Sequence, residues 1–348
     1  MTTYLVIAAL LLIGMLVVQI SKANEYINTL RGDDAELDTD KINGVLWYIF
    51  TVVFLVGIVW STYHYLPLFL PVSASEHGHW IDSMFNITLI LTGIVFVLTQ
   101  GALGWFAWKY HGKKGKLGFY YPENNKLEMI WTIVPAIALT ILVVVGLYYW
   151  FRITGPASDN AKVVEITGKQ FNWLVRYEGP DGKLGTNNWK LIDETNSVGI
   201  DFTDKTGLDD IMPSDLHFEV NKEYLIKIGA RDVIHNVGLN HFRIKMDAMP
   251  GLPTHFKFTP TITTDEMKKI TGNPAFDYEM NCDYLCGKGH SAMKMMVYVD
   301  TKEQHAAWLK TQKSFFELAI KGTDEEKKIG SLAKLEDAEK KKSEHSNH

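Results

Sequence analysis

The chain has 348 residues, of which 47% are hydrophobic and 22% are charged, and its formal net charge is −5. The length alone predicts about two domains. The near balance of acidic and basic residues excludes the strongly basic surface of a typical nucleic-acid-binding protein, so no nucleic-acid partner is expected. With two cysteines, the chain is not a disulfide scaffold.

The mean hydropathy of −0.04 is that of a soluble protein, but it averages two unlike halves. Nearly all long apolar runs precede residue 155, whereas the glycine-rich turns and both cysteines follow it. This division excludes a fully soluble protein and also a transporter that crosses the membrane along its whole length.

Four stretches are apolar enough to cross a bilayer, which takes roughly 17 to 25 residues per helix. The first stretch could be a cleaved signal peptide, but no Lys or Arg precedes it, so we expect it to be retained. Pro135, in the fourth stretch, is expected only to kink its helix. The four stretches cover approximately residues 4–20, 45–66, 84–108 and 129–151.

The orientation follows from the loops, because Lys and Arg concentrate on the cytoplasmic side of a membrane. Lys and Arg follow the first stretch and lie between the third and fourth, whereas residues 67–83 contain neither. Both ends of the chain are therefore expected on the outer side, and the C-terminal half is expected to be exported.

The C-terminal half has many short segments rich in Val, Ile, Tyr and Phe, separated by turn residues, which is typical of a sandwich or barrel. Residues 179–214 form a turn-rich insertion without an assigned role. After residue 300 a helix with apolar Trp308, Phe315, Phe316 and Leu318 leads into a charged tail. The expected strands are 162–167, 173–177, 223–229, 255–259, 276–281 and 294–300.

A compact set of possible metal ligands lies between the last two expected strands, with the spacing C-x3-C-x3-H-x2-M. Thiolate and thioether favour copper(I) or other soft metals, and imidazole binds copper in either oxidation state. A further ligand should come from elsewhere in the fold, and His235, at the end of a strand-like run, is the best candidate. The four residues of the motif are Cys282, Cys286, His290 and Met293.

Other interpretations of the two cysteines stay open at this point. They could form a structural disulfide, which is natural in an exported domain. They could also serve a membrane-anchored copper chaperone or thiol–disulfide protein, although such proteins alternate strands and helices around the cysteines. We expect the remaining candidate ligands to be ordinary core or surface residues: His241, His255, Met295 and Met296.

The motif resembles the binuclear copper centre, CuA, of subunit II of haem–copper cytochrome c oxidases. Residues 235–251 are similar to that family's H-x9-K-x-D-x-x-P-G segment. Residues 127–136 resemble the start of its second transmembrane helix, and residues 168–173 resemble its aromatic strand. The resemblance covers about residues 84–300.

The resemblance implies a membrane-anchored α+β protein, with four transmembrane helices, a cupredoxin-like Greek-key β-barrel and a charged C-terminal helix or tail. Cys282 and Cys286 would bridge two copper ions. His235 and Met293 would complete one copper site. His290 and the backbone carbonyl of Tyr284 would complete the other. The implied parts are an extra transmembrane hairpin (residues 1–66), the family's own hairpin (67–155), the CuA domain (156–300) and the C-terminal helix and tail (301–348).

The function implied is that of subunit II of a terminal oxidase in the bacterial inner (plasma) membrane, with the copper domain on the periplasmic side. Electrons from cytochrome c, or from a haem domain of an associated respiratory complex, would pass through copper to haems in subunit I. Oxygen would be reduced to water there, coupled to proton translocation. Other oxidase subunits and membrane lipid are further expected partners. A quinol oxidase subunit II shares the fold but lacks the copper ligands, which this chain keeps.

Three further residues receive weaker roles from the resemblance. Glu128 would lie at the mouth of a proton-uptake path, and Lys245 and Asp247 would face subunit I. An ordinary helix start explains Glu128 equally well, because an acid is favoured there by the helix dipole. Ordinary turn positions explain Lys245 and Asp247 equally well.

The chain departs from the family pattern in three places. Tyr284 replaces a Glu that helps to bind an interface magnesium, which leaves Asp283 as the alternative carboxylate. Phe171 replaces a Trp at the point of electron uptake, so uptake would use Phe171, nearby Trp173 or a different donor surface. The two extra N-terminal helices would dock another subunit or a respiratory partner complex, or have no separate role.

Overall fold

The structure is a computed structural model that describes residues 2–31, 33–113, 115–324, 326, 327 and 329. The chain divides into two compact units. The first unit comprises Met1–Phe69 and Phe85–Ile141, and the second comprises Leu70–Met84 and Leu142–His348. The second unit therefore contains the β domain together with the start of one long helix and the end of another.

Four long helices precede the β domain, and each is long and apolar enough to cross a membrane. Most of their large apolar side chains are exposed to the surroundings, as expected for helices whose solvent is lipid. This confirms the four spans predicted from the sequence. The helices are α1 (Thr2–Arg31), α2 (Asp33–Tyr65), α3 (Gly78–Lys109) and α4 (Asn125–Thr154).

Small residues allow α2 to approach α3 closely within the first unit. A Cβ atom placed on Gly104 would lie 2.5 Å from Oγ1 of Thr51, so no larger side chain fits there without a shift. The Tyr48 ring packs against Trp105 and Trp108, with ring centroids 6.4 and 5.4 Å apart. Close backbone approach at small residues is the usual way in which helices associate in lipid. The second of the extra helices is therefore packed directly on α3.

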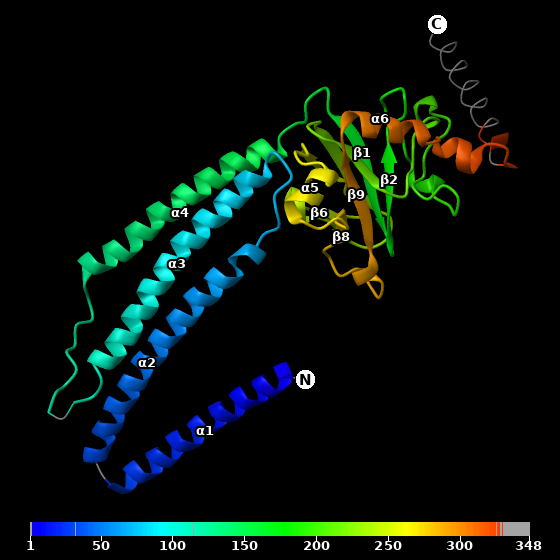
Figure 1. Ribbon diagram of the computed structural model, residues 1–348. Helices are drawn as coiled ribbons and strands as arrows, with labels where there is room; N and C mark the ends of the chain where they lie inside the picture. Colours follow the sequence, from blue (N-terminus) through cyan, green and yellow to red (C-terminus); the bar gives the residue numbers. More distant parts are fainter. Residues whose placement is uncertain (1, 32, 114, 325, 328, 330–348) are drawn as a thin grey trace. The chain divides into compact units, whose positions relative to one another are not determined.

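The β domain consists of two sheets (Figure 1). The strand orders are β2-β1-β4-β7 and β3-β9-β8-β5-β6. The β1–β4 and β3–β9 pairs are parallel and the other pairs are antiparallel. The first sheet contains β1 (Lys162–Lys169), β2 (Asn172–Tyr177), β4 (Tyr224–Ala230) and β7 (Thr254–Phe258). The second contains β3 (Leu216–Glu219), β5 (His235–Leu239), β6 (Ile244–Ala248), β8 (Tyr278–Cys282) and β9 (Lys294–Asp300).

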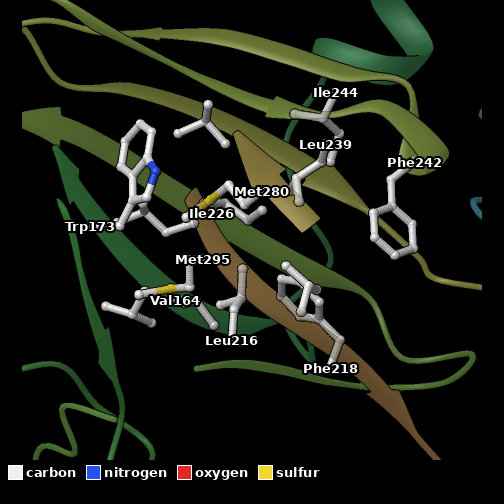
Figure 2. Packing of buried hydrophobic residues seen from close by; sticks show 14 of the residues in the cluster. Val164, Trp173, Leu216, Phe218, Ile226, Leu239, Phe242, Ile244, Met280 and Met295 are labelled. Carbon is white, nitrogen blue, oxygen red and sulfur yellow. The ribbon is translucent and has the colours of Figure 1, made fainter. Parts of the chain in front are cut away.

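Alternate residues of these strands are buried between the two sheets, as in β1 and β9. Figure 2 shows Trp173 and Ile226 of the first sheet in the same interior as Met280 and Met295 of the second. Each large apolar side chain buried there stabilises the fold by roughly 1.5–3 kcal/mol. The structure therefore confirms the predicted fold class, apolar helices followed by a cupredoxin-like β domain, and divides that domain into two facing sheets.

All six strands predicted from the sequence are present, but three others and one helix were missed. The missed elements are β3, β5, β6 and α5 (Thr264–Thr271). The prediction that His235 ends a strand was wrong, because this residue begins β5. The preceding residues 231–234 form a bend and not a strand. Every residue of β5 is buried, so its sequence lacks the polar and apolar alternation on which the prediction relied.

The C-terminal segment is helical where the sequence predicted it. Helix α6 (Lys302–Thr311) contacts β3 and β9 (Figure 1). Its Trp308 ring stacks on His217 of β3, with centroids 4.2 Å apart. A π-helical turn, η6 (Phe316–Ile320), follows, and Phe316 packs against Phe202 of the insertion. The part of the predicted tail at residues 330–348 lies outside the described residues.

Hydrogen bonds attach the segment before α3 to the β domain within the second unit. The Ala74 amide donates to the His241 carbonyl (2.7 Å). Arg243 forms a two-point ion pair with Asp82 of α3, with Nε to Oδ1 at 2.6 Å and Nη2 to Oδ2 at 2.9 Å. Bidentate pairs of this kind fix geometry as well as charge. The first turns of α3 are therefore held on the β domain.

The packing of α2 on α3 can be tested with a substitution at the contact. Gly104→Leu should lower the melting temperature of the detergent-solubilised protein, because overpacking of a close contact costs about 1–3 kcal/mol. Gly93→Leu is the matched control, since a Cβ atom on Gly93 of the same helix meets nothing within 4 Å. Equal melting temperatures for the two variants, measured by circular dichroism, would contradict this helix contact.

Candidate metal centre

The loop between β8 and β9 carries both cysteines. Cys282 is the last residue of β8, and Met293 immediately precedes β9. The Cys282 amide donates to the Met293 carbonyl (3.1 Å), which closes the neck of the loop. Two residues eleven positions apart in the sequence are thereby brought to the same place.

The pairing of β5 with β8 delivers His235 to this loop. Val237 lies opposite Cys282 in the register of the two strands. Side chains two residues apart share one face of a strand, so His235 is the diagonal neighbour of Cys282 on that face. Nδ1 of His235 lies 3.8 Å from the Cys282 sulfur, although the residues are 47 positions apart in the sequence.

The six donor groups named from the sequence lie together around the two cysteine sulfurs. The sulfurs are 3.8 Å apart, and the Tyr284 carbonyl oxygen is 3.2 Å from that of Cys282. Nδ1 of His290 and Sδ of Met293 each lie 3.8 Å from the Cys286 sulfur. We call these groups the donor cluster: the side chains of His235, Cys282, Cys286, His290 and Met293 and the carbonyl of Tyr284.

The cysteine geometry does not correspond to a disulfide. The sulfurs are 3.8 Å apart and both residues are free, whereas bonded sulfurs are about 2.0 Å apart. Thioredoxin-type chemistry is not supported either, because the loop joins two antiparallel strands of one sheet and is not followed by a helix that continues the motif. The disulfide and thiol-exchange interpretations therefore lose their structural basis.

The donor cluster fits a soft metal. Metal–thiolate bonds are about 2.3 Å long, so two donors of one ion can lie up to about 4.6 Å apart. The 3.2 and 3.8 Å separations fall within this limit, and the ligand atoms of His235, Cys282 and Cys286 all lie within 4.8 Å of one another. His235, Met293 and both cysteines are buried, so water has little access to these donors.

Two residues that the sequence analysis did not single out orient the cluster. Asp232 Oδ1 lies 2.9 Å from Nε2 of His235, and its Oδ2 accepts the Gln170 amide at 2.7 Å. The Gln170 side chain donates to the Cys286 carbonyl (2.7 Å). A carboxylate on the outer nitrogen of an imidazole directs the other nitrogen toward a metal. The carboxylate three residues before His235 was the signal available in the sequence.

A glycine makes room for this histidine. A Cβ atom on Gly168 of β1 would lie 2.7 Å from Cδ2 of His235. Any larger residue would displace the imidazole from its present position. Gly168 is therefore part of the site through its lack of a side chain.

Phe171 and Trp173 take different positions beside the cluster. Phe171 is 40% exposed, and its ring rests against the loop between β8 and β9. A Cβ atom placed on Gly289 of that loop would lie 2.4 Å from this ring. Trp173 is 4% exposed and points into the core, with its ring 5.9 Å from that of His235. Phe171 is thus the outer aromatic residue and Trp173 the inner one.

The remaining predicted residues lie at other places in the fold. Glu128 is in the first turn of α4, in the first unit, and its Oε1 accepts the Asn124 amide (3.2 Å). Asp247 of β6 accepts a bond from the Asn236 side chain (2.6 Å). Lys245 of β6 lies 3.9 Å from Asp283, so the carboxylate considered for magnesium already faces a cation.

Comparisons with known proteins connect this chain to one family of membrane proteins. Residues 62–150 match the transmembrane domain of cytochrome c oxidase subunit II. The alternative cytochrome c oxidase subunit 2 of Bradyrhizobium diazoefficiens is 31% identical over 268 residues, which cover 76% of this chain and 91% of that protein. Cytochrome c oxidase subunit 2 of Thermostichus vulcanus is 28% identical over 295 residues, with coverage of 77% and 86%.

Among solved structures, the periplasmic domain of subunit II of the Bradyrhizobium japonicum cytochrome oxidase shares 25% identity with this chain. It matches 45% of this chain and 94% of that domain, with a TM-score of 0.30. The chain is a membrane protein with a cupredoxin-like domain that carries a cluster of soft donors. It belongs to the cytochrome c oxidase subunit 2 family and is a subunit of an oxidoreductase complex.

The free state of the cysteines can be tested by thiol titration. Burial raises the pKa of the Cys286 thiol to about 11, so little thiolate is available at pH 7 in the metal-free protein. We expect slow alkylation of the folded, chelator-treated protein and two alkylated thiols per chain after denaturation, measured by mass spectrometry without reductant. A count of zero would show an obligatory disulfide.

Proposed function

We propose that this chain is the electron-accepting subunit of a terminal oxidase and that its donor cluster binds two copper ions as a CuA centre. The observation that carries the proposal is the convergence of two thiols, two imidazoles, a thioether and a carbonyl at 3.2–3.8 Å from the cysteine sulfurs. Soft sulfur donors mixed with imidazole favour copper over magnesium or calcium. Family membership points to the same chemistry.

Within this centre Cys282 and Cys286 would bridge both metal ions. His235 and Met293 would complete one site, and His290 with the Tyr284 carbonyl the other. When bound, the two coppers would supply one-electron redox chemistry shared through the bridging thiolates. The residues themselves would fill every ligand position, so the site would carry electrons and not bind a substrate, unlike an open catalytic metal site.

The protein's contribution is rigidity. Asp232 and Gln170 hold His235 and the loop by hydrogen bonds of 2.7–2.9 Å, and the neck bond fixes Met293. Ligands held in the same positions before and after reduction reduce the structural rearrangement that accompanies electron transfer. A smaller rearrangement lowers the barrier to electron transfer, as preorganised dipoles lower the barriers of other reactions.

The outward path of the electrons would lead to haems held by subunit I, where oxygen would be reduced to water with proton translocation. We propose Glu128 as the entrance of a proton path and Lys245 and Asp247 as residues facing that subunit. The excess of Lys and Arg in the loops supports a periplasmic position for the β domain in a bacterial membrane. The interface magnesium is left out of the proposal, because Lys245 faces Asp283.

The four-part organisation expected from the sequence also stands as a proposal. Residues 1–66 would be an addition to the family's hairpin at 67–155, followed by the CuA domain at 156–300 and the C-terminal helix and tail at 301–348. The contact of Thr51 with Gly104 supports a structural role for the added α2, which packs on the family's own helix.

Electron paramagnetic resonance of the purified, full-length protein in its native complex tests the copper assignment. We expect a mixed-valence signal with one electron shared between two copper nuclei, and Cys286→Ser should abolish it because a bridging sulfur is lost. Ser291→Ala, on the same loop, is the matched control and should retain the signal. A single-copper spectrum from the intact protein would contradict the proposal.

Phe171 is the proposed contact for electron uptake, because it is exposed and touches the loop that carries the ligands. Phe171→Ala should slow second-order reduction by the donor about tenfold, the loss expected for one aromatic anchor of an interface. Stopped-flow spectroscopy would measure this rate, with the copper signal unchanged.

Leu318→Ala is the control for this experiment. Leu318 is 64% exposed and lies in η6, away from the residues that touch the loop. Equal rates for the two variants would move electron uptake to Trp173 or to a different donor surface.

A further inference from the structure

A cavity of about 210 Å³ lies in the second unit, where the chain passes between its long helices and the β domain. Three parts of the chain form its walls. They are the segment before α3 with the start of that helix, the end of α4, and β7 with the residues next to β4 and β7. The cavity is lined by Glu76, His77, Trp80, Arg152, Ile153, Glu223, Lys257, Phe258 and Thr259. We call it the Arg152 cavity.

The walls of the Arg152 cavity are built and not accidental. The Glu76 amide donates to the Thr259 carbonyl (3.0 Å). The Ser158 amide donates to Oε2 of Glu223 (3.0 Å). Nζ of Lys257 donates to the Pro156 carbonyl (2.9 Å), which ties β7 to the residues that follow α4.

The charges around the cavity are balanced but not paired. It is lined by two cations, Arg152 and Lys257, and by two carboxylates, Glu76 and Glu223. In the part of the chain that the structure describes, none of these four groups forms an ion pair within 4.0 Å. Opposite charges that line one cavity without pairing with each other are available to a ligand that carries both signs.

Arg152 is held in place by aromatic rings. Its guanidinium lies 4.4 Å from the centre of the Trp80 ring, which stacks on Tyr149 at 5.7 Å. Nη1 of Arg152 also donates to the Tyr148 hydroxyl (3.2 Å). Rings of this kind at the end of an apolar helix mark the headgroup level of a bilayer. Arg152 is two residues from the end of α4, so the cavity lies at that level.

A buried histidine also lines the cavity. His77 is 5% exposed and its Nε2 has no hydrogen-bond partner in the described part of the protein. Burial lowers the pKa of His77 to about 4, so the ring is neutral at pH 7. Its interactions with the backbone of Arg243 and Phe242 are of the kind that favour a protonated nitrogen. Nε2 is then a buried acceptor, so the ring contributes to the shape of the cavity wall and not a ligand contact.

We propose that the Arg152 cavity binds the headgroup of a phospholipid that carries both a phosphodiester and a primary ammonium group, as in phosphatidylethanolamine. Arg152 and Lys257 would bind the phosphodiester, and Glu76 and Glu223 would bind the ammonium.

A primary ammonium donates three hydrogen bonds, which a trimethylammonium cannot do. The cavity should therefore prefer ethanolamine over choline. A phosphatidylglycerol headgroup has no cation, so it would leave both carboxylates without a cationic partner. The bound lipid would connect the end of α4 with β7.

Native mass spectrometry of the full-length protein in its complex, released from mild detergent with defined added lipid, tests this site. We expect phosphatidylethanolamine to be retained about tenfold better than phosphatidylcholine or phosphatidylglycerol. Equal retention of the three lipids by the wild-type protein would overturn the proposal without any variant. Displacement of the lipid by millimolar inorganic phosphate alone would identify a free-anion site, which would also overturn it.

Two paired variants assign the two halves of the headgroup. Arg152→Gln with Lys257→Gln should lower retention of phosphatidylethanolamine about tenfold. Glu76→Gln with Glu223→Gln should abolish the preference over phosphatidylglycerol. The matched control, Lys310→Gln with Glu303→Gln on α6, should change neither. Unchanged retention in both cavity variants would contradict the assignment. The copper signal reports on a different part of the domain. It therefore distinguishes this outcome from failure of the electron-transfer role.

Discussion

The pairing of β5 with β8 is the interaction on which the site depends. The register that sets Val237 against Cys282 fixes His235 beside the sulfurs from a distance of 47 residues in sequence. The hydrogen bond from the Cys282 amide to the Met293 carbonyl fixes the two ends of the loop next to each other. The first is a strand pairing and the second is a backbone hydrogen bond at the end of β8, so the donor positions are set by the fold before any metal arrives. A register slip of one residue would turn His235 to the opposite face.

The structure separates the buried donors from the surface that would meet a partner. The cysteines, His235 and Met293 are shielded, whereas Phe171 is exposed and rests on the glycines of the same loop. A short path from surface to ligand with little solvent around the ligands suits a carrier of electrons. In the proposed centre protein groups would fill every ligand position, so it would not suit a site that must admit and release a substrate.

Much of this arrangement could be predicted from the sequence, because the loop brings four ligands in one short segment and the strands of the first sheet alternate clearly. His235 was the candidate for a distant ligand before any family was considered, whereas the carbonyl of Tyr284 and the sharing of the ligands between two copper ions came from the resemblance to a known family. Strand β5 was missed because both of its faces are buried, which removes the alternating pattern. Gly168 was missed because its role depends on a contact between strands that are distant in the sequence. Asp232 was missed although it lies only three residues before His235, because a carboxylate at that spacing is a common feature of turns.

The central claim is that the donor cluster holds two metal ions. Native mass spectrometry of the complex, with the subunit released in the gas phase, would count the copper bound to this chain. We expect two copper ions per chain in the wild-type protein. We expect none once both Cys282 and Cys286 are replaced by Ser. One copper ion, or another metal in a fixed ratio, would contradict a binuclear centre at these residues.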